Sequence, residues 1–239
     1  MSFDFQAGEV LLFNKPIGWT SFDVVNKVRY LIRSHLGIKK IKVGHAGTLD
    51  PLATGLLVLC TGKFTKRIQE FQDQGKEYTG TFLLGATTPS FDKETDVDKT
   101  YDISHITENK ILDAAKQLTG DIEQIPPIFS AIKIKGKRAY DYARKNKDLK
   151  LGPRKVNINE FEITGIELPE VYFRISCSKG TYIRSVARDF GEALGAGSYL
   201  TSLCRTKSGS FHISETMTIY EFQELLKAGE PSDNQDVNV

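Results

Sequence analysis

One carboxylate, Asp50, lies in a sequence setting that suits acid–base or nucleophilic chemistry. Residues 43–59 read VGHAGTLDPLATGLLVL, so that Asp50 follows two glycines and directly precedes Pro51. A residue before proline is disfavoured in the helical region, and glycines admit backbone conformations closed to other residues, so we expect a shaped loop here. A carboxylate on such a loop can act as a nucleophile or transfer a proton.

The charges around Asp50 strengthen this interpretation, because it is the only acidic residue between Asp23 and Glu70. Positive neighbours favour the ionised form of a carboxylate, so we expect Asp50 to be charged. An aspartate before proline can also cap a turn, and the residues alone leave that alternative open. Nine cations share the stretch: Lys27, Arg29, Arg33, Lys39, Lys40, Lys42, Lys63, Lys66 and Arg67.

Residues 44–55, GHAGTLDPLATG, closely resemble the catalytic-aspartate motif of the TruB-type tRNA pseudouridine synthases. This family isomerises uridine 55 in the T-loop of tRNA to pseudouridine, and its aspartate corresponds to Asp50. The resemblance extends over about residues 9–209 through the segments NKPIGWTS, KEYTG, QIPPIFSAIKIKGKRAYDYAR and GTYIR and an LxRTxSG pattern. It implies an enzyme that uses neither a cofactor nor a metal.

The resemblance also implies roles for residues around the target base. Tyr78, in KEYTG, would stack on the base and is a candidate proton acceptor, although a tyrosine at the start of a strand is ordinarily a packing residue. Arg184, in GTYIR, would form an ion pair with Asp50. Tyr182 and Leu203 would form apolar walls of the uracil pocket.

Further residues would support this pocket or hold the RNA. His45 would fill or brace the space that the base leaves, although a lone histidine is equally well a packing residue. Lys15 and Pro16 would brace the floor of the site, which is a structural role. RNA contact falls on one group of basic residues, Lys133, Lys135, Lys137, Arg138 and Arg144.

The charge distribution agrees with an RNA partner. The formal net charge is only +2, but residues 133–155 carry ten basic residues against Asp141 and Asp148, a net charge of +8. Tyr140 and Tyr142 lie in the same block, and cations interleaved with aromatic rings suit a surface that follows a phosphate backbone and stacks on bases. A merely solvated surface is the alternative interpretation.

Apolar periodicity and turn residues predict the elements that position these groups. Thr20 followed by Asp23 resembles a capping box, and apolar residues at helical spacing continue until Gly37, so we expect a helix between them. Further helices are expected over residues 63–74, 107–118, 183–194 and 219–228, and strands over residues 10–13, 76–85, 128–135, 155–166 and 171–177. The polar residues 87–103 indicate a mobile surface loop.

This mixture of strands and helices predicts the α+β class. The family resemblance implies a pseudouridine synthase fold, in which a large mixed, mostly antiparallel sheet is flanked by helices. The 239 residues, 40% of them hydrophobic, can bury one sizeable core. We expect a catalytic domain over residues 9–212, which includes an RNA-clamping insertion at about 124–155. Residues 213–239 are expected to form a short helix and a polar tail, too few for the C-terminal RNA-binding domain that many bacterial family members carry.

The sequence predicts a cytoplasmic, monomeric enzyme whose partner is the T-arm stem-loop of tRNA. No signal peptide or apolar run of spanning length is apparent, and we expect neither a membrane nor an obligatory protein partner. The three cysteines, Cys60, Cys177 and Cys204, match no metal spacing and resemble reduced thiols.

Three other functions stay open at this stage. A glycoside or nucleoside hydrolase would want a second carboxylate near Asp50, and the surrounding sequence offers none. A non-catalytic RNA-binding or RNA-folding protein would explain the basic block but not the contexts of Asp50, Tyr78 and Arg184. A guide-dependent rRNA pseudouridine synthase of the same superfamily would need protein partners, so activity of the purified chain alone on a bare T-arm would separate it.

Overall fold

The protein was analysed as a computed structural model that describes residues 3–129, 133–134, 137–138 and 151–228. The chain divides into two compact units. The first unit comprises Met1–Asp73 together with Lys207–Val239, and the second unit comprises Gln74–Thr206. Strands and helices occur in both, in agreement with the predicted α+β class.

The first unit combines a small antiparallel sheet with two long helices. Strand β3 pairs with β1 on one side and with β2 on the other, both antiparallel. The elements of the first unit are β1 (Val10–Lys15), α1 (Ser21–Leu36), β2 (Val43–His45), β3 (Ala53–Thr61), the 3-10 helix η1 (Gly62–Arg67), α2 (Ile68–Gln72), β13 (Phe211–His212), the 3-10 helix η2 (Ile213–Glu215) and α6 (Ile219–Ala228).

Helix α1 begins and ends at the residues that the sequence indicates. Thr20 is its N-cap and forms a complete capping box with Asp23, which satisfies N–H groups that the helix itself leaves unpaired. Gly37 ends the helix in the left-handed conformation, with φ 63°, which glycine adopts without steric cost. The buried face contains Val24, Val28 and Ile32.

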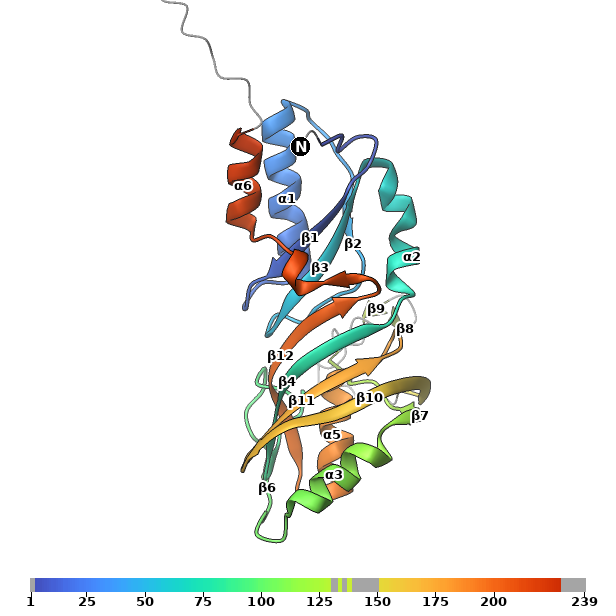
Figure 1. The fold of residues 1–239 in the computed structure, drawn as a ribbon, viewed down its shortest axis with the longest axis vertical. Coiled ribbons are helices and arrows are strands. Elements are labelled where there is room, and N and C mark those ends of the chain that lie inside the picture. Colours follow the sequence, from blue (N-terminus) through green and yellow to red (C-terminus); the bar gives the residue numbers. More distant parts are fainter. Residues whose placement is uncertain (1–2, 130–132, 135–136, 139–150, 229–239) are drawn as a thin grey trace, which may run out of the picture. The chain divides into compact units, whose positions relative to one another are not determined.

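The apolar run of β3 is buried on both faces of the strand. Leu57 and Leu59 join a cluster with α1 and α6, in which Phe13 and Phe222 meet edge to face with 5.3 Å between ring centroids. Leu56 and Val58 face a second cluster, which includes Phe71. Burial on two faces explains why the run does not alternate with polar residues. Figure 1 shows α6 beside α1 in this unit.

The second unit is built on a sheet of strand order β12-β4-β11-β10-β7. The pairs β4–β11, β11–β10 and β10–β7 are antiparallel. Its elements are β4 (Lys76–Leu84), β5 (Ala86–Thr87), β6 (Lys99–Thr100), α3 (Glu108–Gln117), β7 (Gly120–Gln124), β8 (Lys133–Ile134), β9 (Lys137–Arg138), β10 (Arg154–Glu167), β11 (Glu170–Cys177), α5 (Ile183–Leu194) and β12 (Ser198–Ser208), whose last two residues belong to the first unit.

Helices α3 and α5 cover one face of this sheet (Figure 1). The core between them contains Phe82, Phe173 and Phe190. The rings of Phe82 and Phe173 stack with 4.1 Å between their centroids. Because this core holds α5 against the sheet, it fixes the helix whose first turn carries Arg184.

Three sequence expectations need correction. Residues 62–72 form the 3-10 helix η1 followed by the short α2, rather than one α-helix over 63–74, and the N-cap Thr61 makes no side-chain capping bond. In the expected strand 128–135, residues 128 and 129 are not in a strand and Lys133–Ile134 are, whereas residues 130–132 and 135 lie outside the described residues. The expected surface loop 87–103 is exposed over most of its second half, but Thr88, Ser90 and Asp92 are buried.

The remaining elements agree with the sequence expectations to within a few residues. Helix α3 has Thr107 as its N-cap, α5 ends at Gly195 with φ 63°, and α6 spans Ile219–Ala228 as expected. Among the described residues, no helix has the length and hydropathy needed to cross a membrane.

Candidate active site

Asp50 lies on the loop that connects β2 to β3, as its glycine- and proline-rich setting predicts. Its carbonyl accepts a hydrogen bond of 3.0 Å from the N–H of Ala53, which closes a tight turn at the start of β3. Gly47 enters the loop with φ 109°, a conformation that side-chain-bearing residues rarely adopt. Asp50 itself is half-buried.

The residue after Asp50 is fixed by Lys15, which is fully buried at the end of β1. The Lys15 Nζ donates to the carbonyls of Pro16 at 3.0 Å, Trp19 at 2.6 Å and Pro51 at 3.3 Å. The N–H of Gly18 donates to the same Pro51 carbonyl at 2.9 Å. Lys15 therefore ties the NKPIGWTS turn to the Asp50 loop.

The residue before Asp50 is fixed by Ser21, the first residue of α1. The Ser21 Oγ donates to the Leu49 carbonyl at 3.1 Å and accepts from the Leu49 N–H at 2.8 Å. Both groups are buried, so the bonds are shielded from competition with water. Sequence reasoning did not single out Ser21, although it is the last residue of the NKPIGWTS segment.

The backbone of Asp50 is consequently held from both sides by groups of one segment, residues 15–21. His45 lies at the end of β2 in the same connection, is half-buried and pairs with Leu59 of β3. The arrangement presents the Asp50 carboxylate on a backbone that is held through both of its neighbours, Leu49 and Pro51.

In the second unit, Arg184 lies in the first turn of α5 and is 4% exposed. Its Nη2 donates to the Phe129 carbonyl at 2.8 Å and its Nη1 donates to the Ser90 carbonyl at 3.3 Å. Its Nε lies 3.5 Å from Oδ2 of Asp92, whose side chain is 6% exposed. A cation in the first turn opposes the helix dipole, and Asp92 is an anion that compensates it.

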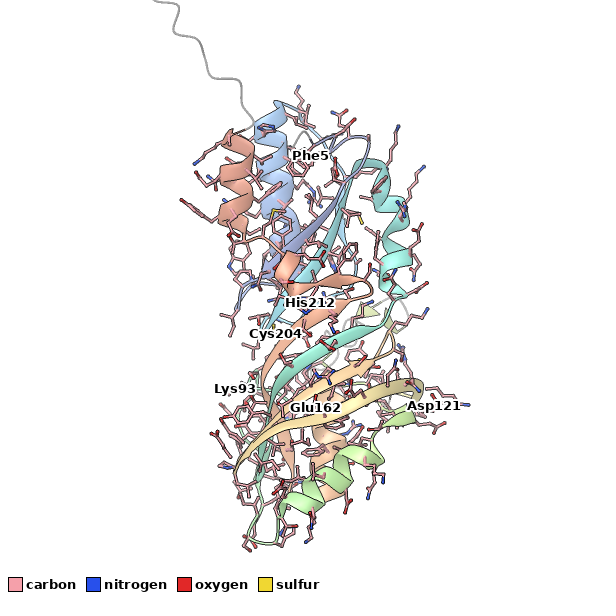
Figure 2. The ribbon with its side chains drawn as sticks, viewed as in Figure 1. Phe5, Lys93, Asp121, Glu162, Cys204 and His212 are labelled. Atoms are coloured by element: carbon pink, nitrogen blue, oxygen red, sulfur yellow. The ribbon has the colours of Figure 1, made fainter. Side chains whose placement is uncertain are left out.

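Asp92 is a buried partner of Arg184 that sequence reasoning missed, because FDKETDVDKT has the composition of a solvated loop. Its Oδ1 accepts from the Ser90 hydroxyl at 2.6 Å and from the Glu94 N–H at 2.9 Å. The backbone of the preceding residue, Phe91, accepts from the Leu200 N–H of β12 at 2.9 Å. The next residue, Lys93, is exposed and is labelled in Figure 2. Over residues 88–93, buried positions thus alternate with less buried ones.

The other predicted pocket residues also belong to the second unit. Tyr78 lies on β4 opposite Ile175 of β11, and Leu203 lies on β12. Both are partly buried and pack against the core of this unit. Tyr182 directly precedes α5 and is its N-cap.

Some of the predicted RNA-binding residues lie on a short antiparallel pair. Strands β8 and β9 pair with Lys133 opposite Arg138 and Ile134 opposite Lys137. Lys135 and Arg144 lie outside the described residues. RNA contact by this group of residues stays a prediction.

Cys60 and Cys177 are buried thiols. Burial raises the pKa of both Cys60 and Cys177 to about 11, so these thiols stay protonated near neutral pH and are poor nucleophiles. Within the described ranges, no group of three or more His, Cys, Asp or Glu residues has the arrangement to hold a metal ion.

Residues 33–183 match the family model described as "TruB family pseudouridylate synthase (N terminal domain)". The tRNA pseudouridine synthase B of Phocaeicola vulgatus is 56% identical over 223 residues, which cover 93% of this chain and 95% of that protein. The enzyme of the same name from Flavobacterium johnsoniae is 55% identical over 94% of this chain and 98% of that protein.

Two solved structures share the fold. The chain matches a protein in the crystal structure of a Cbf5–Nop10–Gar1 complex with a TM-score of 0.68 and 31% identity, covering 92% of this chain. It matches one in the structure of an H/ACA RNP bound to a substrate RNA containing 2′-deoxyuridine with a TM-score of 0.67 and 27% identity. The chain spans 54% and 57% of the lengths of these two solved chains.

Proposed function

The chain belongs to the TruB family of pseudouridylate synthases, and from this premise we propose that it converts uridine 55 in the T-loop of tRNA to pseudouridine. Formation of pseudouridine in tRNA is the activity named for relatives that match it over nearly the whole chain at 50–56% identity. The position within tRNA and the roles of individual residues are the further parts of this proposal.

The reaction is an isomerisation, so every atom of the nucleoside is retained. The bond between N1 of uracil and C1′ of the ribose breaks, the ring turns, and a bond forms between C5 and C1′. The proton on C5 leaves and N1 ends with a proton, so the chemistry requires no oxidant or reductant. A carboxylate can attack the sugar or the ring, or can assist deprotonation of the ribose, and we assign this task to Asp50.

We assign the supporting roles to residues of the second unit. Arg184 would hold Asp50 ionised and oriented, since an opposite charge favours the charged form of a carboxylate. Tyr78 would stack on the uracil and is the candidate for accepting the C5 proton. Tyr182 and Leu203 would shield the released uracil from water, and His45 would brace the space that the flipped nucleotide vacates.

The partner that we propose is the T-arm stem-loop of tRNA, bound by a monomer in the cytoplasm. Lys133, Lys137 and Arg138 come from a pair of strands within a block of net charge +8, and cations of this kind neutralise backbone phosphates. Phosphate contacts position the RNA, and the pocket residues would then select the uridine.

The observation that supports this proposal most directly is the support of Asp50 from both sides. Leu49 is bonded through both backbone groups to Ser21, and Pro51 accepts from Lys15 and Gly18. A turn aspartate that only caps its own loop would not require a buried lysine and a buried serine on its two neighbours. Such preorganisation is typical of a group that must meet its substrate in a fixed geometry.

The test is release of tritium from C5-labelled uridine in a bare T-arm stem-loop, incubated with the purified chain alone. We expect tritium release by the wild type and a loss of about 10⁴-fold or more for Asp50→Asn, with RNA affinity retained. Asparagine keeps the shape of the side chain and removes the charge, and the backbone bonds on either side do not involve the carboxylate.

Two controls make the result decisive. A stem-loop with cytidine at position 55 should release no tritium, whereas release from it would place the reaction at another uridine. Activity retained in Asp50→Asn would refute the role of the aspartate. RNA binding by the wild type without tritium release would favour the non-catalytic or the guide-dependent alternative.

A further inference from the structure

Gln124 is a buried amide that the proposed chemistry does not use. It ends β7, is 1% exposed, and makes two hydrogen bonds to the backbone of Tyr182, 58 residues further along the chain. Its Oε1 accepts from the Tyr182 N–H at 2.8 Å, and its Nε2 donates to the Tyr182 carbonyl at 3.1 Å. A buried amide with both functions satisfied by a single residue fixes that residue in position and in orientation.

The chemistry of the two bonds determines the orientation of the amide. Exchanging the oxygen and nitrogen of Gln124 would set an NH₂ group against the Tyr182 N–H and an oxygen against its carbonyl, which loses both bonds. The Gln124 side chain therefore bonds both backbone groups of Tyr182, as the backbone of a neighbouring β-strand would. Replacement by a side chain with only a donor or only an acceptor breaks this match.

Tyr182 needs such a partner because it is the N-cap of α5 and makes no side-chain capping bond of its own. Its carbonyl also accepts the first helical hydrogen bond, from the Val186 N–H at 3.1 Å. Gln124 thus supplies from another element part of the fixation that a capping side chain normally provides. Two residues later the same helix carries Arg184.

Gln124 also marks the start of the predicted insertion. In the pairing of β7 with β10, Gln124 lies opposite Arg154, the first residue of β10. These two residues are the points where the chain leaves the sheet and returns to it on either side of residues 125–153. One side chain therefore joins the base of the RNA-clamping segment to the residue that precedes α5.

We propose that Gln124 is a positioning residue for pseudouridine formation, which holds Tyr182 in register with the base of the RNA-clamping insertion. This inference rests on the proposed function, in which Tyr182 is a wall of the uracil pocket. The insertion holds the RNA while Tyr182 shields the released base, so the two must keep a fixed separation during ring rotation. Loss of the link lowers the rate of the chemical steps more than it lowers the affinity for RNA.

The experiment compares Gln124→Met with Asn157→Leu. Methionine has nearly the shape of glutamine and neither amide function. Asn157 lies on β10, and its Nδ2 donates to Oδ1 of Asp121 at 2.7 Å. Asn157→Leu therefore deletes a side-chain hydrogen bond between the same two strands, β7 and β10, that does not involve α5. Figure 2 shows Asp121 on β7, the strand that ends at Gln124.

The readout is the single-turnover rate of tritium release at saturating enzyme, with RNA affinity measured by filter binding. At saturation this rate reports folded, RNA-bound enzyme only, so a merely destabilised variant keeps the wild-type value. We expect Gln124→Met to fall by about 10-fold to 100-fold, the size typical of a group misplaced by about 1 Å. Its affinity should stay within about threefold of wild type, and Asn157→Leu should match the wild type in both.

A double variant tests whether Gln124 acts through Tyr182. In a Tyr182→Ala background, Gln124→Met should lower the rate no further, because the wall that it positions is already absent. An unchanged rate for Gln124→Met, an equal loss in Asn157→Leu, or fully additive losses in the double variant would each overturn the proposal. Gln124→Glu keeps the acceptor for the Tyr182 N–H and serves the same measurement if Gln124→Met does not fold.

Failure of this inference differs from failure of the proposed function. A wild-type chain without tritium release, or an active Asp50→Asn variant, contradicts the function itself. An active wild type with an inactive Asp50→Asn and an unaffected Gln124→Met contradicts only the role of Gln124.

Discussion

The supports of Asp50 and of Arg184 differ in chemistry and in distance along the chain. Asp50 is held through its neighbours, by a lysine and a serine that bond backbone groups of Leu49 and Pro51. Arg184 is held through its own side chain, by the carboxylate of Asp92 and the carbonyls of Ser90 and Phe129. The first is a scaffold of bonds to the backbone of the neighbouring residues, and the second is a charge network of which the arginine is a member.

This difference determines what a substitution can reveal. Asp50→Asn removes a charge and leaves in place the bonds that Lys15, Gly18 and Ser21 make to Leu49 and Pro51, so its effect on turnover reports the loss of that charge. A change at Arg184 removes part of the packing of α5 against residues 90–92, so its effect on turnover combines chemistry with stability. The same loss of activity therefore carries different meaning at the two positions.

The largest effect on stability is expected for Arg184→Met. It leaves the Asp92 carboxylate buried without this cation, and breaking one partner of a buried ion pair typically costs about 3–5 kcal/mol. Urea unfolding should show this loss, and the double variant Arg184→Met/Asp92→Asn should lose less than the sum of the two single losses. Strictly additive losses would mean that the pair does not interact and would remove the contrast with Asp50.

The same contrast explains which parts of the molecule the sequence predicts. The bounds of α1 follow from Thr20, Asp23 and Gly37, and the loop at Asp50 follows from Gly47 and Pro51, because each depends on groups close in sequence. Strands β10 and β11 follow from alternation on either side of Leu168 and Pro169. Local rules are sufficient where the stabilising partners are local.

Partners that are distant in sequence account for the main omissions. Asp92 lies among charged residues whose composition suggests a solvated loop, and the cation that it meets in the core, Arg184, lies 92 residues away. Gln124 shows the same pattern, since its two partners belong to Tyr182. The roles of Tyr78, Tyr182, Leu203 and His45 came from a family resemblance, because a half-buried tyrosine, leucine or histidine carries no local sign of function.

An intermediate effect is expected for Lys15→Met, which removes the donor shared by the carbonyls of Pro16, Trp19 and Pro51. Pro51 keeps the Gly18 N–H, but the loss of a buried donor from its acceptors costs about 1–3 kcal/mol. Turnover should fall by about tenfold or more, because the loop that carries Asp50 loosens. Urea unfolding and single-turnover rates check both, and Lys40→Met, at an exposed lysine of the same unit, is the control. Unchanged turnover would mean that the scaffold does not position Asp50.

The smallest effect is expected at Thr20, whose capping box starts the helix that carries Ser21. Thr20→Ala should cost about 1 kcal/mol at neutral pH, the usual value of an N-cap.

The Thr20 side chain, then its backbone N–H, and then the charge of Lys15 lower the pKa of Asp23 below its ordinary value. A depressed pKa in the folded state contributes stability above the unfolded value of about 3.9 and loses it as the pH falls through the folded value. The difference in unfolding free energy between wild type and Thr20→Ala should therefore shrink below about pH 4. It should not vanish, because the Asp23 N–H still donates to the Thr20 hydroxyl at 3.0 Å when the carboxyl is protonated. If this difference in unfolding free energy stays constant down to about pH 2.5, the Asp23 carboxylate contributes nothing to the cap. The capping box would then add nothing to the support that Ser21 gives the Asp50 loop.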